Sequence, residues 1–279
     1  MSKYLSSAQA EEFDSLVHQV YQADGRLRPH VTVRNGVVGG IHHFRTMGKG
    51  LANQKASQAD VTPMDIVHTK VPCTLEDWLA PEYTDIFDQA AVNFDEKSQL
   101  ASAIAKAMHR REDQLIIDAL DASTPTASIA TTVGGAGTGL NLAKLHAAAG
   151  ALDNNGVDEQ GRCIVSNSLS KQTLLAETEV GSTDYNSVRA LVNGEVDSFL
   201  GFNFVWIPNN AEGGITSASD VYDGYAFHMD ALGLAIGLDH RTEVNYIAEK
   251  TSWLCNGLFK SGAVAIDETG IVKIQSTET

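Results

Sequence analysis

The sequence predicts an α+β fold in which some parts project from a compact body, and three features of its 279 residues support this interpretation. A helical periodicity runs from about residue 95 to residue 122, and several strand-like segments follow in the second half of the chain. The stretch from Gly36 to Pro63 is rich in glycine and too poor in apolar residues to bury itself. The net charge is −15, yet residues 25–59 carry six basic residues and no acidic one. We therefore expect a long scaffold helix, an exposed loop and a basic arm on an acidic body.

The N-terminal part is expected to form a helix and an arm. Residues 6–22 place apolar side chains at helical spacing, with acidic residues near the start, and Asp24-Gly25 ends the segment. Residues 30–34 indicate a short strand, and Asn35-Gly36 is typical of a turn.

A two-stranded flap is expected next. Residues 67–75 alternate apolar and polar side chains, which is the pattern of a strand that returns from the glycine-rich loop. Pro72 has no N–H group, so it favours a position at a sheet edge. Two strands alone gain little stability, so the flap needs a partner surface.

The long helix is expected to begin at a capping box, with Asn93 as the N-cap and Glu96 three residues later. At about 1.5 Å per residue it would span roughly 42 Å, which exceeds the width of a small domain. Asn141 is expected to cap a second helix. The remaining expectations are a strand at 163–165, a helix over 168–177, a loop with one helical turn over 178–193, a strand pair or bent strand over 199–208, a loop over 209–224, a helix or a strand over 226–236, and strands over 242–247 and 258–274.

The motifs that suggest chemistry lack their supporting residues. The glycine loop at 135–140 has no P-loop Lys-Ser/Thr pair, and Leu140 stands where a dinucleotide fingerprint needs glycine. Ser168 and Lys171 match the SxxK pattern of penicillin-recognising hydrolases, but this pattern arises easily by chance and the SDN partner is absent. The nine His and three Cys residues show no metal-ligand spacing. We therefore expect no catalytic, cofactor or metal site, and an apolar run long enough for a membrane span is also missing.

Two groups of basic residues are candidates for contacts between subunits. The first group either lines a solvated loop or forms a strap on the acidic surface of a neighbouring copy. Its members are Arg26, Arg28, Arg34, Arg45, Lys49 and Lys55. The second group, Arg110 and Arg111, either belongs to a solvated helix face or makes an intersubunit or interior contact. Features that one copy cannot satisfy alone imply assembly.

In this order the elements resemble a tailed-bacteriophage major capsid protein of the Hong Kong 97 type. The resemblance rests on the arm, the extended loop and the long helix containing Ala107-Met108-His109-Arg110-Arg111. Residues 194–196 and 199–208 resemble a strand of the axial domain, and residues 253–274 look like the closing strands of the peripheral domain. The resemblance covers nearly the whole chain.

The resemblance implies a Hong Kong 97-like capsid fold with a defined division of the chain. The expected parts are an N-terminal helix and arm (1–35), an extended loop (36–76), a peripheral domain (77–135) with a spine helix at about 95–122, an axial domain (136–240) and a return to the peripheral domain (241–279).

The resemblance also implies a structural role rather than an enzymatic one. Copies of the chain would form hexamers and pentamers of an icosahedral phage head around double-stranded DNA, without sequence-specific binding and without a membrane. The implied partners are other copies, a portal, a separate scaffolding protein and possible decoration proteins, with assembly in a bacterial cytoplasm and the virion as destination. An encapsulin-like shell around protein cargo is the alternative, and an SxxK hydrolase is a remote one.

Overall fold

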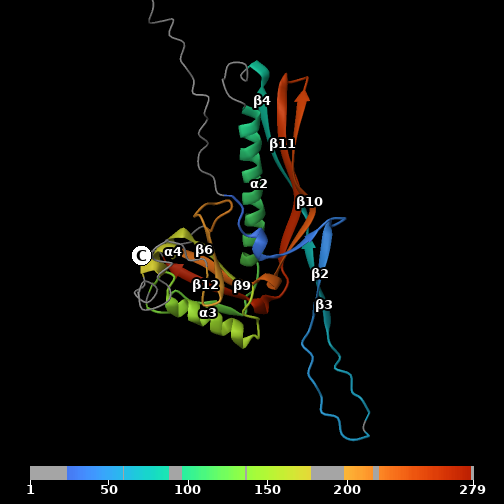
Figure 1. Ribbon diagram of the computed structural model, residues 1–279, viewed down its shortest axis with the longest axis vertical. Coiled ribbons are helices and arrows are strands. Elements are labelled where there is room, and N and C mark those ends of the chain that lie inside the picture. Colours follow the sequence, from blue (N-terminus) through green and yellow to red (C-terminus); the bar gives the residue numbers. More distant parts are fainter. Residues whose placement is uncertain are drawn as a thin grey trace, which may run out of the picture.

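The computed structural model describes residues 24–58, 60–87, 96–135, 137–176, 198–215 and 220–277. It contains a four-stranded sheet, a six-stranded sheet and a two-stranded hairpin, with one long helix along the first sheet (Figure 1). The expected helix over 6–22, the cap at Asn93 and the loop over 178–193 lie outside the described residues.

The four-stranded sheet has the order β1-β10-β11-β4. Its members are β1 (Thr32–Asn35), β10 (Leu232–Ile247), β11 (Ser252–Ala265) and β4 (Glu76–Asp85). The pairings β10–β11 and β11–β4 are antiparallel, whereas β1 runs parallel to the first residues of β10. The strand β10 therefore covers the strand expected over 242–247 and the second part of the segment expected over 226–236, although two register shifts interrupt its ladder with β11. The first residues of the latter segment belong to the strand β9 (Val221–His228) and to a short 3₁₀ helix.

The long helix α2 (Glu96–Asp121) confirms the expected helix, ends within one residue of the expected C-terminal end and is about 39 Å long. Its Ile104 and Met108 pack against Cys255 and Phe259 of β11. Gly257 lies between these two strand residues, and a side chain at that position would collide with Ile104. Glycine therefore lets the helix lie close to the sheet.

The six-stranded sheet has the order β5-β12-β9-β6-β8-β7. Its members are β5 (Ala127–Ile129), β12 (Ile271–Thr277), β9 (Val221–His228), β6 (Arg162–Asn167), β8 (Phe202–Ile207) and β7 (Ser198–Phe199). The helices α3 (Leu142–Asn154) and α4 (Ser168–Ala176) lie beside this sheet (Figure 1). The Asn141 side chain accepts a hydrogen bond from the Lys144 N–H group, which confirms the expected cap.

Two apolar clusters hold these layers together. One joins Ile116, Ile117 and Leu120 of α2 to both sheets, and Leu27 of the N-terminal segment is fully buried in it. The other fills the space between the six-stranded sheet and the helices α3 and α4. The short 3₁₀ helix η2 (Arg28–His30) precedes β1, whereas η3 (Met229–Ala231) connects β9 to β10 and η4 (Glu268–Gly270) connects β11 to β12.

Each sheet combines strands that lie far apart in the sequence, and the expected domain ranges 136–240 and 241–279 stay a prediction. The chain returns to the four-stranded sheet at Leu232, where β10 begins, and to the six-stranded sheet at Ile271, where β12 begins. The reason is that Ile271 belongs to one buried cluster and Val272 and Ile274 to the other, so β12 is covered on both faces and lies between β5 and β9 in the second sheet. The assignment of axial and peripheral domains stays a prediction.

Candidate subunit-contact surfaces

The flap is an antiparallel hairpin of β2 (Ile41–Met47) and β3 (His68–Thr74), as the alternation in residues 67–75 predicted. Its base is docked on the four-stranded sheet, where Phe44 and Cys73 are buried with Ala235 of β10. A Cβ atom at Gly233 would lie 2.6 Å from the Phe44 ring, so this glycine makes room for the ring. Since Leu234 belongs to the cluster with α2, its neighbours Gly233 and Ala235 face the other side of the sheet. The flap base therefore sits opposite α2.

Residues 48–67 connect β2 to β3 and extend well beyond the body (Figure 1). Large apolar side chains are exposed along this loop, including Leu51 at 80% and Val61 at 78%. A contact with the body comes from Lys49, whose Nζ atom donates to the carbonyl oxygen of Asn155 at 3.0 Å. Exposed apolar side chains on a projecting segment are typical of an interaction site.

The edge strand β4 of the four-stranded sheet offers a second exposed surface. Because Trp78 and Ala80 of β4 pack toward α2, Leu79 and Tyr83 lie on the opposite face, and they are 67% and 44% exposed. This is the same face on which the flap base sits. The strand β4 also carries four carboxylates and no basic residue, namely Glu76, Asp77, Glu82 and Asp85.

The six basic residues of the first group lie in two different settings. Arg26 and Arg28 lie on the body: the guanidinium of Arg26 donates to the Trp206 carbonyl at 3.0 Å, and that of Arg28 makes two hydrogen bonds to Asp239 at 3.1 Å. The other four residues follow this segment in the sequence, and their side chains are exposed. They are Arg34, Arg45, Lys49 and Lys55. Whether any of the six contacts another subunit stays a prediction.

The charged run on α2 is largely packed inside the subunit. Arg111 lies over the Trp78 ring at 3.8 Å, and Arg110 lies against Gly213. Glu112 and Asp113 are each only 4% exposed. For Arg111, Glu112 and Asp113, the interpretation as an interior contact therefore fits the structure better than the interpretation as a solvated helix face.

Asp113 anchors the N-terminal segment, and the sequence alone did not indicate this role. Its carboxylate accepts hydrogen bonds from the N–H groups of Arg26 at 2.8 Å and Leu27 at 3.0 Å. Burial raises the pKa of Asp113 to about 6, although these two hydrogen bonds act in the opposite direction. The segment is held further by Asp24, whose pKa is lowered by its hydrogen bond to His109.

A second buried carboxylate lies one residue before this anchor. Glu112 lies 2.7 Å from Nε2 of His240 on β10 and 3.7 Å from Nε of Arg28. Helix α2, strand β10 and the N-terminal segment are therefore joined by charges as well as by apolar packing.

The glycine loop before α3 is organised by a buried lysine. The Nζ atom of Lys144 donates to the carbonyl oxygens of Thr138 at 2.6 Å and Gly139 at 2.9 Å. Burial lowers the pKa of Lys144 to about 8. The loop thus turns carbonyl oxygens toward an amine of its own chain, whereas a phosphate-binding loop presents N–H groups to its ligand.

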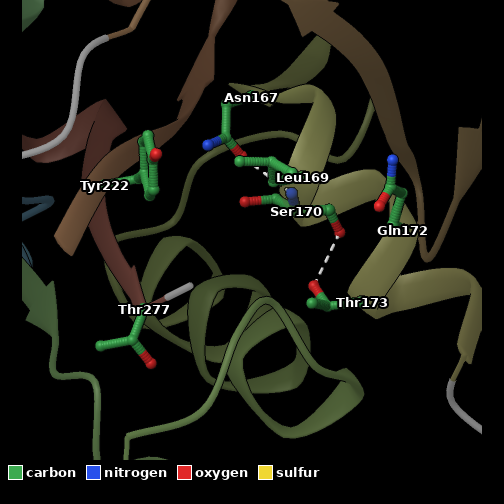
Figure 2. A pocket seen from close by; sticks show the side chains of 7 residues that line it. All are labelled: Asn167, Leu169, Ser170, Gln172, Thr173, Tyr222 and Thr277. Carbon is green, nitrogen blue, oxygen red and sulfur yellow. Dashed lines mark hydrogen bonds between the residues drawn. The ribbon is translucent and has the colours of Figure 1, made fainter. Parts of the chain in front are cut away.

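The SxxK pair does not assemble a site in the described residues. A cavity of about 250 Å³ lies beside α4, and Figure 2 shows Asn167, Ser170 and Thr173 among its lining residues. Neither Ser168 nor Lys171 lines it, and the Ser168 hydroxyl donates to the Ile207 carbonyl at 3.3 Å. Within the described ranges, no group of three or more His, Cys, Asp or Glu residues could hold a metal ion, and no helix is long and apolar enough to cross a membrane.

Comparison with known proteins gives one consistent result. The family model of phage capsid proteins matches residues 5–278. The structure is similar to the capsid of cyanophage P-SCSP1u, with a TM-score of 0.78 and 18% identity over 100% of this chain and 96% of that chain. It is also similar to a chain of Mycobacterium phage Che8, with a TM-score of 0.74 and 17% identity over 96% and 97% of the two chains. The head structure of Helicobacter pylori bacteriophage KHP40 matches with a TM-score of 0.78 and 10% identity over 100% and 98%. No curated protein matches the sequence.

Proposed function

The chain belongs to the phage capsid protein family, and on this premise we propose that its copies form hexamers and pentamers of a closed icosahedral head of the Hong Kong 97 type around double-stranded DNA. The main support for the proposal is the contrast between the base and the loop of the flap. Its base is packed on the subunit, while the loop over 48–67 presents apolar side chains to solvent. A second copy is the partner that covers this loop in every subunit of a shell.

The flap of one copy lies on the open sheet face of the next copy. Leu51 and Val61 of the loop and Leu79 and Tyr83 of the sheet are exposed apolar groups that would cover one another. The charges favour the same arrangement, because residues 41–75 hold four basic and two acidic side chains whereas β4 holds four acidic ones. Each exposed ion pair contributes about 1 kcal/mol or less, but a closed shell repeats the contact in every subunit.

The enclosed DNA is held without sequence-specific contacts. A subunit of net charge −15 repels phosphate weakly at distances within a Debye length of about 8 Å at physiological salt, and this lets DNA slide during packing and release. A portal, a separate scaffolding protein and decoration proteins complete the proposed set of partners, with assembly in the bacterial cytoplasm.

Shortening the flap tests the proposal. Met47 and His68 are paired opposite each other in the β2–β3 ladder, so an Asn-Gly turn can replace residues 48–67 and close the hairpin. We expect the shortened subunit to fold and melt as the full chain does, because Phe44 and Cys73 remain in place. Negative-stain electron microscopy should show closed shells for the full chain and none for the variant. Normal shells from the shortened chain would contradict the proposed strap.

A companion pair of substitutions separates the loop's apolar contact from its length. Val61→Ser and Met64→Ser keep all residues of the loop but remove exposed apolar groups, 78% and 54% accessible. We expect fewer shells and no change in subunit melting. Nucleic acid in purified particles, measured as the ratio of absorbance at 260 and 280 nm, distinguishes a phage head from a compartment with protein cargo.

A further inference from the structure

The two edges of the four-stranded sheet differ in how well they are protected against pairing. On the β4 edge, Pro81 removes one N–H donor and four carboxylates would repel an identical strand. On the other edge, β1 covers β10 only from Gly233 to Ile236. Beyond that point, no described residue pairs with β10 on the side away from β11. Among the residues that the structure describes, the second half of β10 is therefore a free sheet edge.

The residues of this free edge suit strand pairing. Residues 241–247 include Thr242, Val244 and Tyr246, which are β-branched or aromatic, and they contain no proline. Val244 is 43% and Tyr246 47% exposed. Val244 pairs with Cys255, which packs on α2, so these side chains lie on the α2 face of the sheet. The Tyr246 ring contacts the Trp253 ring with centroids 5.3 Å apart.

We propose that residues 241–247 of β10 pair antiparallel with the same residues of a second copy, around a two-fold axis through Val244. In this register Val244 faces its own copy, Thr242 faces Tyr246, Glu243 faces Asn245, and Arg241 faces Ile247. Aromatic residues opposite β-branched ones stabilise antiparallel pairs, and no charged residue faces a like charge. Continuing the ladder by two residues would place Asp239 opposite Glu249, so the pairing ends at Arg241 and Ile247.

Shell symmetry supplies the reason for a contact of this kind. A closed icosahedral shell contains two-fold axes, and a two-fold interface must use the same patch on both subunits. Pairing here joins two sheets into one, with both α2 helices on the same side. A ladder of seven residues is a small interface, and its strength comes from repetition over the shell. The inference rests on the proposed self-assembly but names a surface distinct from the flap.

Cross-linking tests the register directly. The native Cys73, Cys163 and Cys255 are buried, but Cys255 pairs with Val244 within the subunit, so Val244→Cys and its control are both made in a Cys255→Ala chain, where the new thiol has no partner in its own subunit. Facing residues of an antiparallel pair have Cα atoms about 4.5 to 5.5 Å apart, a separation that a disulfide spans. Oxidation of assembled particles with copper–phenanthroline, which removes two electrons and two protons from the two thiols, should give a covalent dimer on a non-reducing gel.

Leu238 provides the matched control for this experiment. It lies on the same strand and is 41% exposed, but in the proposed register the two copies of residue 238 are about 40 Å apart. We expect Val244→Cys to give on the order of tenfold more dimer than Leu238→Cys, given the distance a disulfide can bridge. Equal yields, or no dimer from Val244→Cys in intact shells, would overturn the pairing.

Charge complementation gives an independent readout. Val244→Lys alone and Val244→Glu alone each place like charges at the axis, so each should assemble poorly, while a mixture of the two should recover shells. Failure of the mixture to recover, with both variants folded, would also overturn the pairing. If the unaltered chain forms no shells, the proposed function itself fails, and that result is read separately from the cross-link.

Discussion

Replacing Phe44 with alanine should release the flap from the body without unfolding the body. Phe44 is 6% exposed and belongs to a small cluster at the flap base that is separate from the two main clusters. Removing a buried phenylalanine side chain costs about 3 kcal/mol in a packed site. Since 1.4 kcal/mol changes an equilibrium about tenfold, opening of the flap should increase roughly 100-fold.

Amide hydrogen exchange measured by mass spectrometry reports this opening. Peptides that contain β2 and β3 should lose protection roughly 100-fold, while peptides from β6 and β9 should keep their protection. Val38→Ala is the control, because Val38 lies just before the flap and is 97% exposed. Equal loss of protection in β6 and β9, or no loss in β2 and β3, would refute the idea that the flap is an element docked only at its base.

Four further substitutions test the packing and the buried charges. Burial raises the pKa of Asp113 from 3.8 to about 6, so the folded state binds the proton more tightly than the unfolded state does. When the pH falls from 7 to 5, the free energy of unfolding of the unaltered chain, measured with urea, should therefore rise by about 1 kcal/mol relative to that of Asp113→Asn. A constant difference would contradict this. Gly257→Ala should destabilise the subunit by about 1 to 3 kcal/mol through collision with Ile104, whereas Gly150→Ala, with open space around it inside α3, should stabilise it by about 0.5 kcal/mol. Lys144→Met should cost about 1 to 3 kcal/mol in the same assay because two loop carbonyls lose their donor, and an unchanged midpoint would count against that role.

Elements governed by local signals were predictable from the sequence. The helix α2 follows a long apolar periodicity, α3 begins at a capping asparagine, and the flap strand β3 follows a period of two. In each case neighbouring residues determine the structure, so their order along the chain is sufficient.

The strand β4 was not predicted, although it has the same period. Its partly buried positions carry Trp78 and Ala80, but acidic residues and Pro81 fill much of the remainder, so the apolar alternation is weak. The strand forms because the long edge of β11 is available to pair with it from Glu76 to Asp85. Such an edge is visible only in the folded chain.

The buried charges on α2 show a second limit of sequence reasoning. A run of four charged residues suggests a solvated surface, yet Asp113 is buried because its partners, the N–H groups of Arg26 and Leu27, come from a distant part of the chain. The same long-range contact places Arg26 and Arg28 on the body rather than in a free arm. Partners far apart in sequence leave no local pattern, so residue spacing could predict neither the burial of Asp113 nor the position of Arg26 and Arg28.

Cryo-electron microscopy of shells assembled from the full chain tests the central claim most directly. We expect density for residues 48–67 on the sheet of a neighbouring subunit, in contact with Leu79 and Tyr83. Density for that loop on its own subunit, or a shell in which Leu79 and Tyr83 face only solvent, would contradict it.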